Sequence, residues 1–205
     1  MKKFAFFLFA ALICIRVSGQ SQAETFIKEA QDFLAKQEYK QAILSLQDAI
    51  NDINLLLAKQ VAESLPADIN GLKADGDSEV STAGMGMIGG GMQITKRYRN
   101  EAKEGNDAEV QILANSPLLS TLSMYISNPS MLGQEYKSVR VGATRAILKS
   151  EIEDDGTTKT RSTEIQIPLG QTLIMVRANG FATEQEELAF ATKLDLEKIR
   201  KALGE

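Results

Sequence analysis

The spacing of apolar residues changes along the chain and divides it into regions. An unbroken apolar run fills positions 4–15. Apolar residues over 24–65 then recur every three or four positions, as on one face of a helix. From Gly84 onward, apolar and polar residues alternate, as in half-buried strands. The pattern predicts a helical hairpin over 20–65 and a mainly antiparallel α+β domain over 84–205.

The hairpin region predicts two helices. The second begins near Tyr39 and meets no glycine or proline before Pro66. In the first helix the apolar positions are Phe26, Ala30, Phe33 and Leu34. The second helix carries one apolar stripe, formed by Ile43, Leu46, Ile50, Ile53, Leu57 and Val61.

Two short patterns in this region carry a resemblance. They are Ala30-x-x-Phe33 and Tyr39-x-x-Ala42-x-x-x-Leu46-x-x-Ala49. Over about 24–57 the chain resembles a single tetratricopeptide (TPR) motif, in which small residues lie where two helices cross. No second copy follows, so a repeat array is not expected. The resemblance leaves two alternatives: a hairpin packed on its own C-terminal domain, or a groove that binds a partner.

Residues 66–83 are rich in Asp, Gly and Ser and poor in apolar residues. They are predicted to be a linker or a long surface loop. Beyond them, strand-like runs occupy 92–99, 109–112, 137–141, 144–152, 162–167 and 172–178. Short connections favour antiparallel pairing, because parallel neighbours need a crossover of about a dozen residues. We therefore expect a sheet of about six strands.

Two further helices are predicted around this sheet. One begins at Ser116-Pro117 and stops at Asn128-Pro129. The other opens with a capping box, Thr183 to Glu186, and runs to Leu203 with a kink near Asp195. We expect both helices to cover one face of the sheet. This order of elements resembles exported bacterial α+β proteins of uncharacterised function.

The N-terminus has the three parts of a secretory signal. Met1-Lys2-Lys3 is basic, the apolar run follows, and Val17-Ser18-Gly19 supplies small residues for cleavage. A membrane anchor needs about twenty apolar residues, and this run is shorter and ends at Arg16. We predict that residues 1–19 are a signal peptide, that the mature chain does not span a membrane, and that it is periplasmic or secreted.

The amino-acid composition limits the kinds of binding and catalysis that we expect of the protein. The 205-residue chain has 23 basic and 27 acidic residues, and loss of Lys2, Lys3 and Arg16 would make it more acidic, which disfavours nucleic-acid binding. Cys14 is the only cysteine and would leave with the leader. There is no histidine, so the usual base for a serine nucleophile is missing. We expect no catalytic residue, no cofactor and no metal site.

Two motifs imitate ligand sites without their context. Gly84-Met85-Gly86-Met87-Ile88-Gly89 fits G-x-G-x-x-G, but no strand precedes it and no helix follows, so a bulge or close backbone contact is favoured. The alternative is a ligand or partner lying against this Gly/Met strand. Glu151 to Gly156 imitates an EF-hand loop, but Ser162 occupies the position of the bidentate glutamate. An acidic hairpin tip is the preferred interpretation, and the acids Asp75, Asp77 and Glu79 are interpreted as ordinary surface residues as well.

Basic residues recur on the predicted strands. They are Arg97, Arg99, Arg140, Arg145 and Lys149. Pairing with Glu109, Glu151 and Glu164 on a solvated face is the preferred interpretation, because cross-strand charge pairs are common. A site for an anionic ligand is the alternative.

These observations predict an exported, non-enzymatic binding or interaction protein of the bacterial envelope with a protein partner. The first alternative is a periplasmic carrier of a small apolar or amphiphilic ligand, held between the sheet and its helices. The second is a hydrolase that uses serine or carboxylates. The pattern alone does not identify the binding residues.

Overall fold

The computed structural model describes residues 21–81, 91–114, 118–128, 131, 133–154 and 159–204. The chain divides into two compact units, Met1–Ala49 and Ile50–Glu205. Four sequence predictions lie outside the described residues. They concern the signal peptide (1–19), the glycine motif (84–89), the helix start (116–117) and part of the acidic hairpin tip (155–158).

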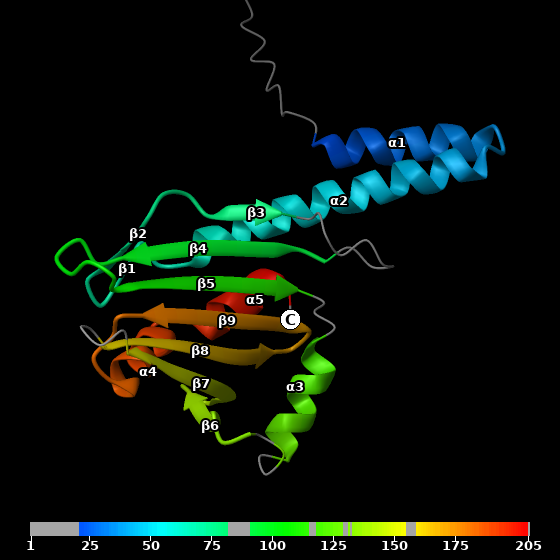
Figure 1. Cartoon of the computed structure of the whole chain (residues 1–205). Coiled ribbons are helices and arrows are strands. Elements are labelled where there is room, and N and C mark those ends of the chain that lie inside the picture. The colour runs from blue at the N-terminus through cyan, green and yellow to red at the C-terminus, as the bar shows by residue number, and fades with distance from the viewer. Residues whose placement is uncertain are drawn as a thin grey trace, which may run out of the picture. The chain divides into compact units, whose positions relative to one another are not determined.

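The first unit contains the predicted helical hairpin. Helix α1 spans Gln22–Ala35, and α2 begins at Tyr39 and runs to Ser64, with its later turns in the second unit. The Ser21 side chain caps α1 by accepting a hydrogen bond from the backbone N–H of Glu24. At the connection Gln37 adopts a left-handed backbone conformation (φ 60°), which lets α1 lie beside the first half of α2 (Figure 1).

The second unit is built on one antiparallel sheet. Its strands follow the order β1-β2-β4-β5-β9-β8-β7-β6, and β3 pairs with β4 (Figure 1). The longer strands are β4 (Gln93–Arg99), β5 (Asp107–Ala114), β6 (Tyr136–Val141), β7 (Thr144–Asp154), β8 (Lys159–Leu169) and β9 (Thr172–Asn179). These six correspond to the six predicted runs. The α+β class and the mainly antiparallel sheet are confirmed.

The strand count and the linker prediction need correction, because the sheet has nine strands. The extra strands are β1 (Asp68–Ile69), β2 (Leu72–Ala74) and β3 (Glu79–Ser81). Segments of two or three residues are too short to show alternation. Residues 68–81 of the supposed linker therefore contribute three strands to the sheet, and Ile69 and Leu72 are buried in its core.

The helices of the second unit cover opposite faces of the sheet, contrary to our expectation. Helix α3 (Leu118–Ser127) packs through Leu122 against Leu173 and Met175 of β9. The alternate residues of the same strand, Ile174 and Val176, belong to the core shared with α4 (Glu184–Thr192) and α5 (Leu196–Leu203). Successive side chains of a strand point to opposite faces, so α3 lies on one face and α4 and α5 on the other.

The C-terminal helix is two helices. Helix α5 begins afresh at Asp195, whose side chain accepts a hydrogen bond from the backbone N–H of Lys198 at 2.9 Å. The capping box at α4 is also modified. The Thr183 hydroxyl accepts from the N–H of Glu186 as predicted, but the Glu186 carboxylate accepts from the N–H of Ala182.

The loop between β4 and β5 closes tightly on the end of β9. Gly180 has a φ of 66°, and a Cβ there would lie 2.2 Å from the backbone oxygen of Gly105. The Lys103 ammonium donates to the Gly180 carbonyl at 2.6 Å, and the Asn106 amide donates to the Asn179 carbonyl. Glycine is therefore required at 180 both for its conformation and for the space it leaves.

Candidate interaction surfaces

Small residues hold the hairpin together. Among the described residues of the first unit, the buried side chains are Ala23 and Ala30 on α1 and Ala42, Ser45 and Ala49 on α2. The distance between two packed helices depends on the side chains at their contact, and small side chains allow a close approach. The helix–helix contact therefore uses little of the large apolar surface that both helices carry.

Large apolar side chains stay exposed beside this contact. We define the apolar face of the hairpin as Ile27, Leu34, Tyr39, Ile43, Leu46, Ile50 and Ile53, which are between 39% and 61% exposed. Four members of this face each follow a buried alanine by four residues. They are Ile27 and Leu34 on α1 and Leu46 and Ile53 on α2. Because the two helices run in opposite directions, the same offset places both sets on one side of the hairpin.

This finding revises the predicted apolar stripe of α2. The stripe divides, because Val61 is fully buried in the core of the second unit and Leu57 packs against that core. Ile43 and Ile50, by contrast, are each more than half exposed. Helical periodicity located the stripe, whereas the TPR-like pattern, and not the periodicity, indicated the small residues Ala42 and Ala49 that are buried beside it.

Charged side chains form a row across the open part of the sheet. Register places Arg97, Glu109, Arg177, Glu164 and Lys149 opposite one another on five successive strands, and we call them the charge row. Charges alternate along it. Arg97 and Arg177 both bind Glu109, at 3.0 and 3.4 Å, and Arg177 also binds Glu164 at 3.2 Å.

The neighbours of the charge row complete its pairing. Glu79 accepts from Arg97 at 2.6 Å and, with Glu109, raises the pKa of that guanidinium. Lys149 contacts Glu151 at 2.6 Å, and this hydrogen bond raises the lysine pKa. Arg99 binds Asp75 at 2.6 Å. This agrees with the preferred interpretation of a solvated, paired face for these residues.

The predicted basic stripe is not one cluster. Arg97 and Arg99 lie on β4, whereas Arg140 and Arg145 face each other across β6 and β7 at the far end of the sheet. A hollow of about 290 Å³ lies beside Arg97, Arg99 and Arg177. Its walls also carry Asp75, Asp107 and Glu109, so its charges balance and nothing in it selects an anion.

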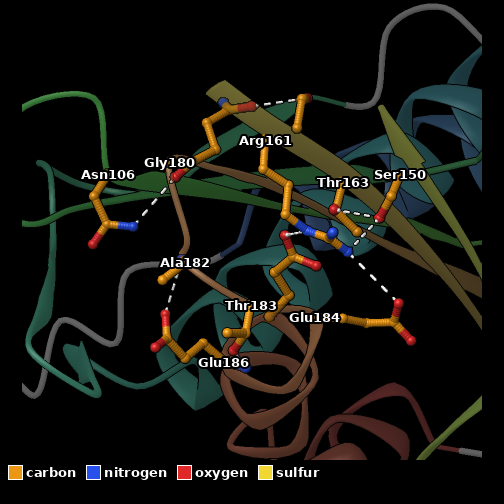
Figure 2. A network of polar contacts seen from close by, with 12 residues as sticks. Asn106, Ser150, Arg161, Thr163, Gly180, Ala182, Thr183, Glu184 and Glu186 are labelled. Carbon is orange, nitrogen blue, oxygen red and sulfur yellow. Dashed lines mark hydrogen bonds and ion pairs between the residues drawn. The ribbon is translucent and has the colours of Figure 1, made fainter. Parts of the chain in front are cut away.

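A buried ion pair fastens α4 to the sheet. The Arg161 Nε on β8 donates to Oε1 of Glu187 at 2.7 Å, and Glu187 is fully buried. The same guanidinium donates to the Ser150 hydroxyl at 2.8 Å and lies 3.6 Å from Glu184 (Figure 2). The hydrogen bond to Glu187 raises the pKa of Arg161. No local pattern indicates this pair, since its members lie 26 residues apart in the sequence.

Helix α3 leaves a smaller hollow on its face of the sheet. Its volume is about 180 Å³, and its walls include Tyr125, Tyr136, Ile147 and Gln166. The opposite face is filled, because Ile94, Ile112, Ile165 and other core side chains are fully buried beneath α4 and α5. A ligand between the sheet and a helix would therefore fit better on the α3 side.

Neither a cluster of metal-binding side chains nor a helix able to span a bilayer occurs within the described ranges. Within them, no three acidic side chains converge on a position that could hold a metal ion. Of the described helices, none combines the length and the apolar composition that a bilayer-spanning segment needs. Comparison with models of known protein families gives no match, and comparison with curated protein sequences gives none.

Proposed function

We propose that this protein is an exported, non-enzymatic binding protein whose helical hairpin docks a protein partner in the bacterial envelope. One observation carries the proposal, namely the apolar face of the hairpin. Single exposed apolar residues are ordinary, but a contiguous set on one side of two helices is typical of an interaction surface. The absence of histidine from the sequence also supports a role without acid–base catalysis.

Site-specific photo-cross-linking tests this docking role. A benzophenone amino acid replaces Ile43 on the apolar face, and in a matched control it replaces Ile152, an isoleucine on β7 that is 64% exposed. We expect the probe at 43 to form one abundant protein adduct in the native envelope and the probe at 152 to form none. Identical adducts from both positions, or none from 43, would refute the hairpin as the docking element.

Export is a separate part of the proposal and has its own test. The sequence supports it through the basic start, the apolar run and the small residues before Gln20. N-terminal sequencing of the protein from its native cells should find a chain that begins at Gln20 in the envelope or external fraction. An intact Met1 in the cytoplasmic fraction would contradict export.

A carrier function is the second candidate, favoured by the hollow beneath α3. Its volume of about 180 Å³ would admit an aromatic ring or a short acyl group, with Gln166 as the polar contact. Native mass spectrometry of the protein from its own cells should then find a small bound molecule, and Ile147→Trp should displace it. A ligand-free mass spectrum would leave the docking proposal as the better account.

A further inference from the structure

We infer that the occupant of the apolar face is a second copy of this chain, so that two hairpins pack into a four-helix arrangement. This inference rests on the proposed docking role of the hairpin and names its partner. The spacing of the exposed residues on α2, the neutral and mixed character of its flanks, and the position of its centre each support it.

The spacing identifies the kind of partner. Along α2 the members are Tyr39, Ile43, Leu46, Ile50 and Ile53, separated by four, three, four and three residues. This alternation is the a/d spacing of a coiled coil, whose complement is another helix with the same repeat. Since the row spans about 21 Å at 1.5 Å per residue, a helix of matching length can cover it. The chain itself supplies such a helix, namely α2 of a second copy.

Charge explains why an identical copy is acceptable. Gln47 and Asn54 flank the row on α2 and are uncharged, so two copies meet without repulsion at these positions. The charged residues at the rim are Glu24 and Lys28 on α1 and Lys40 on α2, and all three are exposed. A rim that carries both positive and negative charges can pair with an identical rim across a two-fold axis. A partner with charges of one sign would instead favour a rim with charges of the opposite sign.

The symmetry of the pair suggests a register to test. Leu46 is the middle member of the row, so an antiparallel pair that overlaps the whole row has its two-fold axis at Leu46. In that isologous arrangement Leu46 lies close to Leu46 of the second chain. Leu44 is also exposed but lies about 200° away around the helix, outside the apolar face. These two leucines are therefore a matched pair of positions for a test.

The first measurement is the mass of the protein by sedimentation equilibrium over about two decades of protein concentration. We expect a dimer, and we expect Ile43→Ser with Ile50→Ser to raise its dissociation constant by roughly 100-fold or more, since four isoleucine side chains lose apolar burial. Both residues are exposed, so the variant should keep the circular dichroism spectrum of the folded chain. Ile152→Ser, which removes an exposed isoleucine elsewhere, should leave the dimer intact.

The second measurement locates the axis. In a Cys14→Ser background, where no other cysteine remains, Leu46→Cys should give covalent dimers with a short bismaleimide and Leu44→Cys should not. A wild-type protein that stays monomeric over the whole range, a dimer that survives the double serine variant, or equal cross-linking at 44 and 46 would overturn the inference.

The two proposals fail in different ways. A monomeric protein whose photo-cross-linked adduct from position 43 contains a different protein overturns the second copy but keeps the docking role. A monomeric protein with no adduct from position 43 overturns both. A dimer that cross-links at 46 and dissociates in the double serine variant supports both.

Discussion

Arg161 and Glu187 form a hydrogen-bonded ion pair at 2.7 Å, although the carboxylate is fully buried and the guanidinium side chain is 21% exposed. Oε2 of Glu187 has no hydrogen-bond partner among the described residues, so Arg161 is its main compensation. The pair joins the middle of the sheet to α4 and explains why a carboxylate is stable in this position.

Removal of Arg161 should therefore be costly. We expect Arg161→Met to lower the free energy of unfolding by roughly 3–5 kcal/mol, because it leaves a buried charge without its partner. Arg177→Met is the matched control, since Arg177 also contacts two glutamates but is about half exposed. It should cost about 1 kcal/mol or less. Urea denaturation measures both, and equal losses would contradict the special role of the buried pair.

Gly180 and Gly142 separate conformational strain from lack of space. Both have positive φ angles, 66° and 59°, but a Cβ at Gly142 meets nothing within 4 Å. We expect Gly142→Ala to cost about 1–2 kcal/mol, the penalty of the left-handed conformation. Gly180→Ala should cost at least about twice as much, because the methyl group overlaps the backbone of Gly105. Thermal unfolding of the two variants provides the comparison, and equal shifts would argue against the close contact.

Tyr98 should make stability fall at alkaline pH. Its ring packs edge-on against Phe190, its hydroxyl donates to the Pro66 carbonyl at 3.0 Å, and burial raises the pKa of its phenol well above the usual value near 10. Above pH 10 the unfolded phenol loses its proton while the folded one retains it, so this contribution to stability is complete below pH 10 and declines as pH rises further.

Tyr98→Phe tests this linkage. The variant should lose about 1 kcal/mol at neutral pH through the missing hydrogen bond and should depend less on pH between about 10 and 12. Ile112→Val, which removes a methylene group from the same core, should lose a similar amount of stability without changing the slope. Parallel wild-type and Tyr98→Phe curves from denaturation at several pH values would refute the assignment to Tyr98.

A large side chain should destabilise the hairpin at the buried position 42 but not at the exposed position 41. Ala42 is 1% exposed, so Ala42→Leu overfills the contact with α1 and should cost about 1–3 kcal/mol. Gln41→Leu places the same side chain on the adjacent exposed position and should change stability by about 0.5 kcal/mol or less. Hydrogen exchange of the amides between 22 and 49 would report the difference, and equal protection would contradict tight packing at Ala42.

Regular alternation made much of the second unit predictable. Strands β4 to β9 each hold at least six residues, which is long enough for a period of two to show in the sequence. Strands β1 to β3 lack that length. Their places in the sheet depend on tertiary pairing, of β2 and β3 with β4 and of β1 with β2. The prediction of the sheet face covered by α3 was wrong. Leu122 and Ile126 indicate that the helix has an apolar side, but they do not indicate which face of the sheet that side packs against.

The surfaces were less predictable than the fold. The sequence predicted that charged residues on neighbouring strands would pair. Which residues lie opposite each other, such as Arg97 and Glu109, depends on the strand register, which only the structure shows. The apolar face was hidden because Ile43 and Leu46 look like core residues in sequence, while Ala42 and Ala49 form the contact. Glu187 lies in the first turn of α4, where acidic residues are common. Its burial therefore could not be predicted from the sequence pattern.

The pairing of β5 with β9 sets the order in which the sheet can be completed. Asp107 on β5 and Asn179 on β9 are partners although their residue numbers differ by 72. The pairings of β6 with β7, β7 with β8 and β8 with β9, by contrast, join strands that are consecutive along the chain. Closing such a long loop is slow compared with forming a hairpin. During synthesis β5 must wait with an unpaired edge until nearly the whole chain has emerged, so nascent molecules pass through an aggregation-prone stage that the finished protein no longer has.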